Sequence, residues 1–180
     1  MPTHMNMRYE EIEKLWPGVE QMQNLATQYG IPDIFQDAGG KLLQLLIATG
    51  LDVVPGRTGA DAKDRMGNEY EIKSVDISNG TKGFTTNHHL TLDTISRYRN
   101  RRWVFATYNR ITLTAAYLVE PGDLEAIFTK WANTLKTCTH INNPKVPLSH
   151  VQAVGRVMYL KDVSPPWAVT KNDTQSLVAA

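Results

Sequence analysis

Two acidic residues and a lysine could do chemistry together in the segment RTGADAKDRMGNEYEIKSVD, residues 57–76. A three-residue hairpin loop ending at Gly67, with this glycine in the left-handed conformation, would place Asp61 directly opposite Glu71. Side chains alternate along a strand, so Lys73 would share a face with Glu71. The spacing therefore predicts two carboxylates and an ammonium group on one surface.

This trio predicts a magnesium site. Opposed carboxylates have Cβ atoms only about 4.5–5.5 Å apart and repel each other unless a cation lies between them. Mg²⁺ prefers carboxylate and carbonyl oxygens, so Asp61, Glu71 and the main-chain carbonyl of Ile72 would suit it. Lys73 would hold a metal-bound water or an attacked phosphate, which favours phosphodiester hydrolysis. The alternative is an exposed charged hairpin, because the acid-x-Lys triplet recurs at residues 61–63.

Composition sets broad limits on the class of protein. A chain of 180 residues predicts one domain with a sizeable core, or one domain carrying a small extra lobe. The single cysteine, Cys138, excludes an internal disulfide and a zinc site built on several cysteines. No apolar run reaches membrane-spanning length, and MPTHMNMRYEEIEK lacks the apolar core of a signal peptide, so we expect a cytoplasmic protein without membrane contact. The net charge of +1 neither demands nor excludes nucleic acid.

The chain begins with helical patterns. Apolar residues recur at helical spacing over residues 9–29, and Pro17-Gly18 predicts two short helical pieces there. Pro32 and Asp33 predict the start of the next helix, which contains KLLQLLIATG and ends at Gly50. Its broad apolar surface could belong to the core alone or also pack against a second copy of the chain.

Strands dominate the following part. Residues 51–54 form a short strand before the 61–76 hairpin; TISRYR forms a helix; WVFATY and ITLTAAYLV form a hairpin across Asn109-Arg110. Asp123 is expected to cap a helix that runs to about Thr137, HINNPKVP to be a loop, and GRVMYL to be the last strand. This order predicts an α/β (α+β) sandwich, with a mixed central β-sheet flanked by helices.

Four arginines lie close together in RYRNRR, at positions 97, 99, 101 and 102. They could contact the phosphates of a nucleic acid. A solvated helix end is the alternative.

Several strings carry a likeness to a known family. DIFQDAGGKLLQLLIATGLDVVPGR, EYEIKS, TKGF, the pair His88-His89 and INNPK occur in this order. Together they resemble the PvuII family of type II restriction endonucleases, within the PD-(D/E)xK nuclease superfamily, over about residues 15–160. The resemblance implies a restriction-endonuclease-like fold and a homodimer that clamps double-stranded DNA, each subunit cutting one strand in a Mg²⁺-dependent reaction. It also implies a single domain over residues 1–162, with a helical dimerisation region at about 9–50 and a catalytic and DNA-reading part at about 51–162. Residues 163–180, with Pro165-Pro166 and polar residues, are expected to form a C-terminal tail without a counterpart in the family.

The same resemblance implies residue roles. Asp61, Glu71 and Lys73 match the catalytic positions, with Tyr98 near the active site. The DNA-binding positions match Asp37 on the minor-groove side together with Thr85, His88, His89, Asn142 and Asn143. Asparagine can contact adenine through two hydrogen bonds and histidine can donate to guanine, so these side chains suit base reading. The implied target is CAGCTG, cut centrally to leave blunt ends.

The chain departs from the family pattern at a few positions. Thr58 stands where the family has a glutamate near the metals, which puts a second metal contact in doubt. Asn87 replaces the first of three consecutive histidines, Thr85 replaces a serine, and one residue is inserted around Asn79-Gly80. The target sequence is therefore less firmly implied than the type of reaction.

Plainer structural roles remain open for these residues. Tyr98 could simply pack its helix, Asp37 could cap a helix or close a turn, and His88-His89 could lie in a solvated loop. Asn142-Asn143-Pro144 is an ordinary turn string. For the whole protein the alternatives are a PD-(D/E)xK repair or structure-selective nuclease and a DNA-binding module without catalysis; the intact acidic pair and lysine disfavour the latter.

Overall fold

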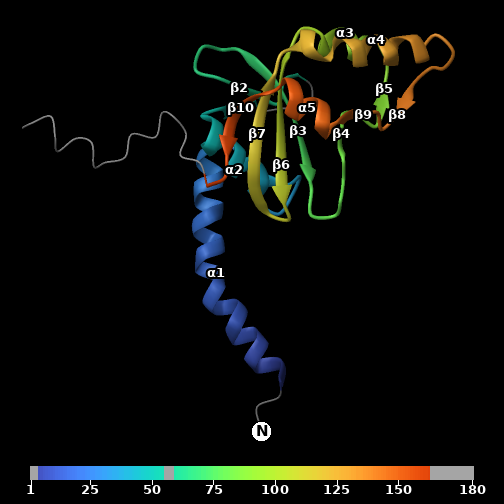
Figure 1. Ribbon diagram of the computed structural model, residues 1–180. Coiled ribbons are helices and arrows are strands. Elements are labelled where there is room, and N and C mark those ends of the chain that lie inside the picture. The colour runs from blue at the N-terminus through green and yellow to red at the C-terminus, as the bar shows by residue number, and fades with distance from the viewer. Residues whose placement is uncertain (1–3, 55–58, 163–180) are drawn as a thin grey trace, which may run out of the picture. The chain divides into compact units, whose positions relative to one another are not determined.

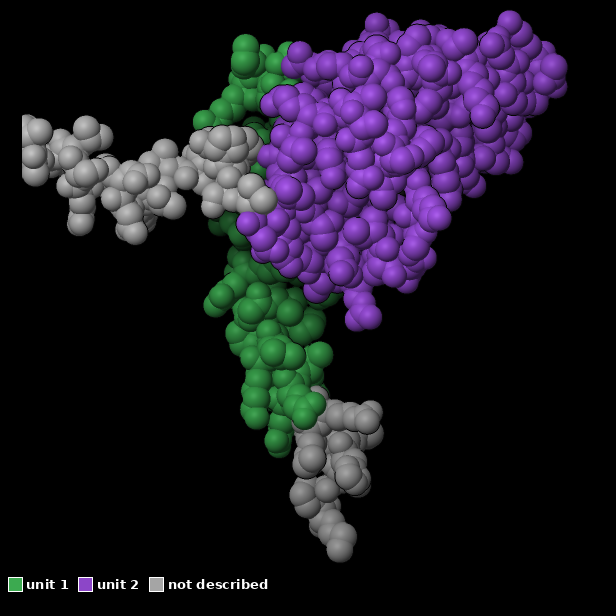
Figure 2. All heavy atoms as spheres, in the orientation of Figure 1, with its two compact units in different colours: residues 1–71 green, residues 72–180 purple. Residues whose placement is uncertain are grey.

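The computed structural model describes residues 4–54 and 59–162. The chain divides into two compact units, unit 1 with residues 1–71 and unit 2 with residues 72–180 (Figure 2). The predicted tail and Thr58 lie outside the described residues. No helix in the described part is both long and apolar enough to cross a membrane.

Unit 1 begins with one long helix, α1 (His4–Gln28), which continues through Pro17 (Figure 1). The prediction of two short pieces was wrong. A proline inside a helix removes one amide donor and disturbs one carbonyl on the preceding turn, a local penalty of about 3 kcal/mol. The helix has 25 residues and continues for eleven residues beyond Pro17, to Gln28, so the interruption remains local.

The second helix, α2 (Gly39–Thr49), begins later than predicted. The carboxylate of Asp33 accepts a hydrogen bond from the amide of Phe35 at 2.8 Å, so Asp33 closes a turn and does not cap the helix. The chain then enters α2 so tightly that a Cβ at Gly39 would lie 2.3 Å from the carbonyl oxygen of Asp33. The predicted end is confirmed, because Gly50 is the C-cap, with φ 70°.

The strands of unit 1 are short. They are β1 (Asp52–Val53), β2 (Ala62–Lys63) and the first residues of β3 (Glu69–Asp76), and β3 continues into unit 2. β1 pairs with β2, and β2 with β3, in antiparallel fashion.

Unit 2 contains the rest of β3 and the remaining elements. Its strands are β4 (Gly83–Thr85), β5 (His89–Leu90), β6 (Arg102–Asn109), β7 (Thr112–Val119), β8 (Ile141–Asn142), β9 (Lys145–Pro147) and β10 (Arg156–Leu160). Its helices are α3 (Leu92–Tyr98), the 3₁₀ turn η1 (Pro121–Leu124), α4 (Glu125–Thr134) and α5 (Leu148–Val154). The strand order in the main sheet is β1-β2-β3-β6-β7-β10. The predicted α/β architecture, a mixed central β-sheet with flanking helices, is confirmed, and the sheet has six strands.

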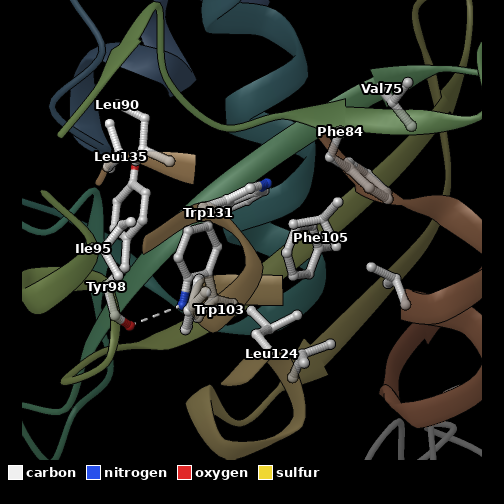
Figure 3. Close-up of a cluster of buried hydrophobic side chains, with 14 residues drawn as sticks. Val75, Phe84, Leu90, Ile95, Tyr98, Trp103, Phe105, Leu124, Trp131 and Leu135 are labelled. Carbon is white, nitrogen blue, oxygen red and sulfur yellow. Dashed lines mark hydrogen bonds between the residues drawn. The ribbon is translucent and has the colours of Figure 1, made fainter. Parts of the chain in front are cut away.

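The core of unit 2 forms on β6. Trp103, Val104, Phe105 and Ala106 are successive residues of this strand and all are fully buried, so β6 is covered on both faces. On one face, the indole ring of Trp103 stacks on the ring of Phe105, with centroids 5.5 Å apart. The other side chains of this cluster come from the helical elements α3, η1, α4 and α5, from strands β3, β4, β5, β7 and β9, and from Leu135 after α4 (Figure 3).

Unit 2 confirms most local predictions and corrects two. The β6–β7 hairpin turns after Asn109 as predicted, since Asn109 pairs with Thr112. Asp123 lies within η1, and α4 begins only at Glu125 and ends at Thr134, so the predicted cap was wrong. The predicted loop HINNPKVP contains β8 and β9, and α5 follows it. Strands of two or three residues have too few positions to show a period in the sequence.

Candidate functional site

The predicted turn between β2 and β3 is confirmed, since Gly67 has φ 83°. Asp64 organises it: its carboxylate accepts hydrogen bonds from the amides of Met66 and Asn68, each at 2.9 Å, and from the Asn68 side chain at 2.7 Å. The Tyr70 hydroxyl donates a further bond at 2.9 Å. These donors, the Asn68 side chain above all, lower the pKa of Asp64 to about 2. The Asp64 carboxylate is therefore ionised at neutral pH, where its hydrogen bonds stabilise the turn between Asp61 and Glu71.

Asp61 lies directly before β2. The observed pairs, Ala62 with Tyr70 and Lys63 with Glu69, have the register that the sequence predicts. The amide of Asp61 donates to the carbonyl of Tyr70 at 3.0 Å, and the side chain of Asp61 is exposed. The expected placement of Asp61 opposite Glu71 thus lies one step beyond the observed ladder.

Glu71 is a buried acidic residue. It is only 6% exposed and is the one charged residue among the buried residues of the described part. Burial of a carboxylate is unfavourable unless hydrogen bonds or a cation compensate for it, and such groups concentrate at functional sites. Lys73 is half-buried and follows two positions later in the same strand, so its side chain leaves the same side of β3.

The donor set suits a hard cation. Asp61 and Glu71 belong to unit 1, and Ile72 and Lys73 to unit 2. Carboxylate and carbonyl oxygens match Mg²⁺, which usually takes one or two protein carboxylates and keeps several waters. Residues 4–54 and 59–162 contain no group of three or more His, Cys, Asp or Glu side chains that could hold a metal.

The second group of predicted residues lies on two segments of unit 2 that pair although they are distant in sequence. β4 pairs with β9 and β5 with β8, so residues 83–90 run antiparallel to residues 141–147 (Figure 1). We call these two segments the paired arm. Within it His89 lies opposite Asn142, and Thr85 opposite Lys145. All five predicted residues on these segments are exposed: Thr85, His88, His89, Asn142 and Asn143.

Two of these side chains contact each other. Nδ1 of His88 lies 2.9 Å from Oδ1 of Asn143. An amide oxygen only accepts, so the protonated Nδ1 of His88 donates this bond, and the Asn143 amide nitrogen and His88 Nε2 keep their capacity for other partners. The backbone agrees, because the amide of Asn143 donates to the carbonyl of His88 at 3.3 Å. Asn143 has φ 48°, a conformation that asparagine adopts more readily than most residues.

Tyr98 lies in the core of unit 2. It is 4% exposed, and its ring packs edge to face against the Trp103 ring, with ring centroids 4.6 Å apart (Figure 3). Its hydroxyl donates to the carbonyl of Thr86 at 3.0 Å. The packing role considered for Tyr98 is therefore present, and its membership of the catalytic set stays a prediction.

Asp37 lies on the turn before α2. Its side chain is exposed and its φ is 46°. The N-cap position belongs to Ala38, which makes no side-chain cap, so Asp37 does not cap the helix. Its contact with DNA stays a prediction.

Three arginines of RYRNRR have carboxylate partners. Arg99 donates two hydrogen bonds to the carboxylate of Glu125 in α4, from Nε at 2.9 Å and from Nη2 at 2.7 Å. This pairing raises the pKa of Arg99. Arg97 contacts Asp93 at 3.2 Å, and Arg102 contacts Glu120 at 3.3 Å. These acids neutralise much of the local charge, which disfavours a phosphate-binding cluster.

The sequence did not lead us to assign a role to Thr86, which connects the two segments of the paired arm. This residue is 5% exposed and donates both its amide and its hydroxyl to the carbonyl of Pro144. The available signal was its place between Thr85 and the paired histidines, where alternation turns one of two adjacent threonines inward.

The chain matches the model of a known family. The model of the family described as restriction endonuclease PvuII matches residues 7–159. The matched range contains the acidic pair, Lys73 and both segments of the paired arm.

Proposed function

The chain belongs to the PvuII restriction endonuclease family, and we propose that this type II site-specific deoxyribonuclease cuts both strands of CAGCTG at its centre, as a Mg²⁺-dependent homodimer. The family match carries the assignment to a DNA-cleaving enzyme of a restriction system. The metal, the target and the dimer are supported by the features described next.

Asp61 and Glu71, with the carbonyl of Ile72, would hold Mg²⁺. When bound, the ion would polarise the scissile phosphate and lower the pKa of the attacking water. The support is the buried carboxylate of Glu71, the oxygen-only donor set and the ordered turn beside Asp61. Lys73 would stabilise the negative charge that develops on the phosphate or hold the water for attack.

The paired arm would read the bases. Asn142 and Asn143 carry side chains suited to adenine, and His88 and His89 carry donors suited to guanine. The support is that these side chains are exposed and gathered on two paired segments. Thr85 would join this set, while Asp37 would contact the minor-groove side. A two-fold dimer would present two such arms to the two halves of a palindrome.

The homodimer is supported by the exposed apolar side chains of unit 1. Tyr9, Ile12, Leu15 and Trp16 of α1 are each 46–69% exposed. Trp16 stacks on Phe35, itself 69% exposed, with ring centroids 6.4 Å apart. A second copy of the chain would remove this apolar area from water.

Digestion of a plasmid of known sequence, with run-off sequencing of the ends, tests target, cut position and metal need together. We expect discrete fragments with blunt ends at CAGCTG in Mg²⁺ and intact plasmid in EDTA. Discrete cutting at another sequence would refute the target alone. A smear, or selective cutting of branched or mismatched DNA, would favour a structure-selective nuclease.

A further inference from the structure

Thr86 connects the two segments of the paired arm to the core. Its amide donates to the carbonyl of Pro144 at 3.0 Å, and its hydroxyl donates to the same oxygen at 3.2 Å. Its own carbonyl accepts the hydroxyl of Tyr98 at 3.0 Å. All three polar groups of this buried residue therefore have partners within unit 2.

These bonds lie where the arm has no ladder. β4 ends at Thr85 and β5 begins at His89, while on the opposite segment β8 ends at Asn142 and β9 begins at Lys145. Thr86 and Pro144 bridge this gap. Ladders of two and three residue pairs fix register weakly by themselves, so a buried bond between them has a large share in holding the segments in place.

The bridge is directly linked to side chains proposed to read bases. Thr86 follows Thr85, and Pro144 follows Asn143. Asn143 and His88, whose side chains contact each other, lie close to this bridge: Asn143 is one residue from Pro144, and His88 is two residues from Thr86. A small displacement of Pro144 would therefore move the Asn143 amide against the His88 ring.

We propose that Thr86 is a specificity-determining positioning residue, which holds Asn143 and His88 in the geometry that distinguishes the target from similar sites. Tyr98 anchors Thr86 to the aromatic core from the other side. Thr86 is buried and does not itself touch DNA. This inference rests on the proposed base-reading function of the arm.

The test is the ratio of dissociation constants for two duplexes, one with the site found by run-off sequencing and one with a single changed base pair. Ca²⁺, which also binds oxygen ligands, replaces Mg²⁺ so that binding is measured without turnover. Thr86→Val keeps the shape and removes the hydroxyl. Loss of one hydrogen bond corresponds to about fivefold per half-site, or about 30-fold for two half-sites, and we expect the ratio to fall by this order.

Matched variants separate positioning from general destabilisation. Thr86→Ser keeps the hydroxyl and should restore most of the ratio. Thr107→Val removes another buried threonine hydroxyl, which contacts Thr114 at 2.7 Å in the β6–β7 hairpin, and should lower the melting temperature without changing the ratio. If Thr86→Val does not fold, Tyr98→Phe removes the other end of the link and should lower the same ratio.

Coupling gives a sharper readout. When Asn143 is already alanine, adding Thr86→Val should change the ratio little, because the group that it positions is gone. Additive effects, or an unchanged ratio in Thr86→Val with normal discrimination by the parent, would overturn the inference. If the parent itself shows no preference between sites, the proposed function fails first, and this inference fails with it.

Discussion

Replacement of Asn143 tests base reading most directly, because two substitutions separate its side chain from its backbone. Asn143→Ala removes the partner of His88 Nδ1 and keeps a Cβ at φ 48°, as in the parent, where a Cβ costs about 1–2 kcal/mol. Asn143→Gly removes the same partner without this strain. The alanine variant should therefore be the less stable of the two, while both lose the same contact with DNA.

The expected loss of binding follows from one base contact. A good pair of hydrogen bonds to a base is worth about 1–3 kcal/mol, which is about 5- to 160-fold in the dissociation constant per half-site. We expect both variants to bind the target more weakly by this order, with little change on random DNA. Fluorescence anisotropy with matched and random duplexes at one fixed salt concentration measures both affinities.

Two results would refute this reasoning. Equal losses on target and random DNA would show that Asn143 contacts only the phosphate backbone. Parent-like affinity of Asn143→Gly, with a loss only in the alanine variant, would show that the backbone conformation matters and the amide does not.

The remaining predictions concern catalysis, assembly and acid stability. Lys73→Ala should abolish plasmid cleavage while largely sparing target binding, whereas Lys63→Ala, in the second acid-x-Lys triplet, should cut normally; turnover near the parent rate in Lys73→Ala would remove this lysine from the mechanism. Leu15→Glu, at a site 69% exposed on α1, should shift the protein from dimer to monomer in light scattering, while Met66→Glu, at a site 88% exposed, should not. The lowered pKa of Asp64 stabilises the fold above its unfolded pKa near 4, and this contribution is lost as pH falls toward about 2. Asp64→Asn should therefore flatten the acid limb of a pH series of melting temperatures, and an unchanged limb would contradict this assignment.

Local chemistry made several elements predictable. The turn at Gly67 and the helix end at Gly50 were predicted correctly because a glycine at positive φ marks each of them. The β6–β7 hairpin was predicted from two long apolar strands with few residues between them. Pro17 led to a wrong prediction, because we interpreted the local energetic penalty of a proline as the end of a helix, although α1 continues through it.

The elements that were not predicted depend on pairing between segments that are distant in the sequence. Strands β8 and β9 form because residues 141–147 pair with residues 83–90. The sequence HINNPKVP contains no local pattern that indicates this pairing. The inward position of Thr86 depends on the same pairing. Asp61, Glu71 and Lys73 could be proposed from spacing within one hairpin, whereas the residues of the paired arm could be proposed only through the family resemblance.

The connection between Thr86 and Pro144 also affects the order of folding. Their hydrogen bond closes a loop of 58 residues, and such a closure costs about 3–4 kcal/mol of chain entropy before its contacts form. The β6–β7 hairpin lies inside that loop and closes across a short turn, so it can form early. We therefore expect the paired arm to assemble after the β6–β7 hairpin, and a nascent chain lacks the arm until synthesis has passed residue 144.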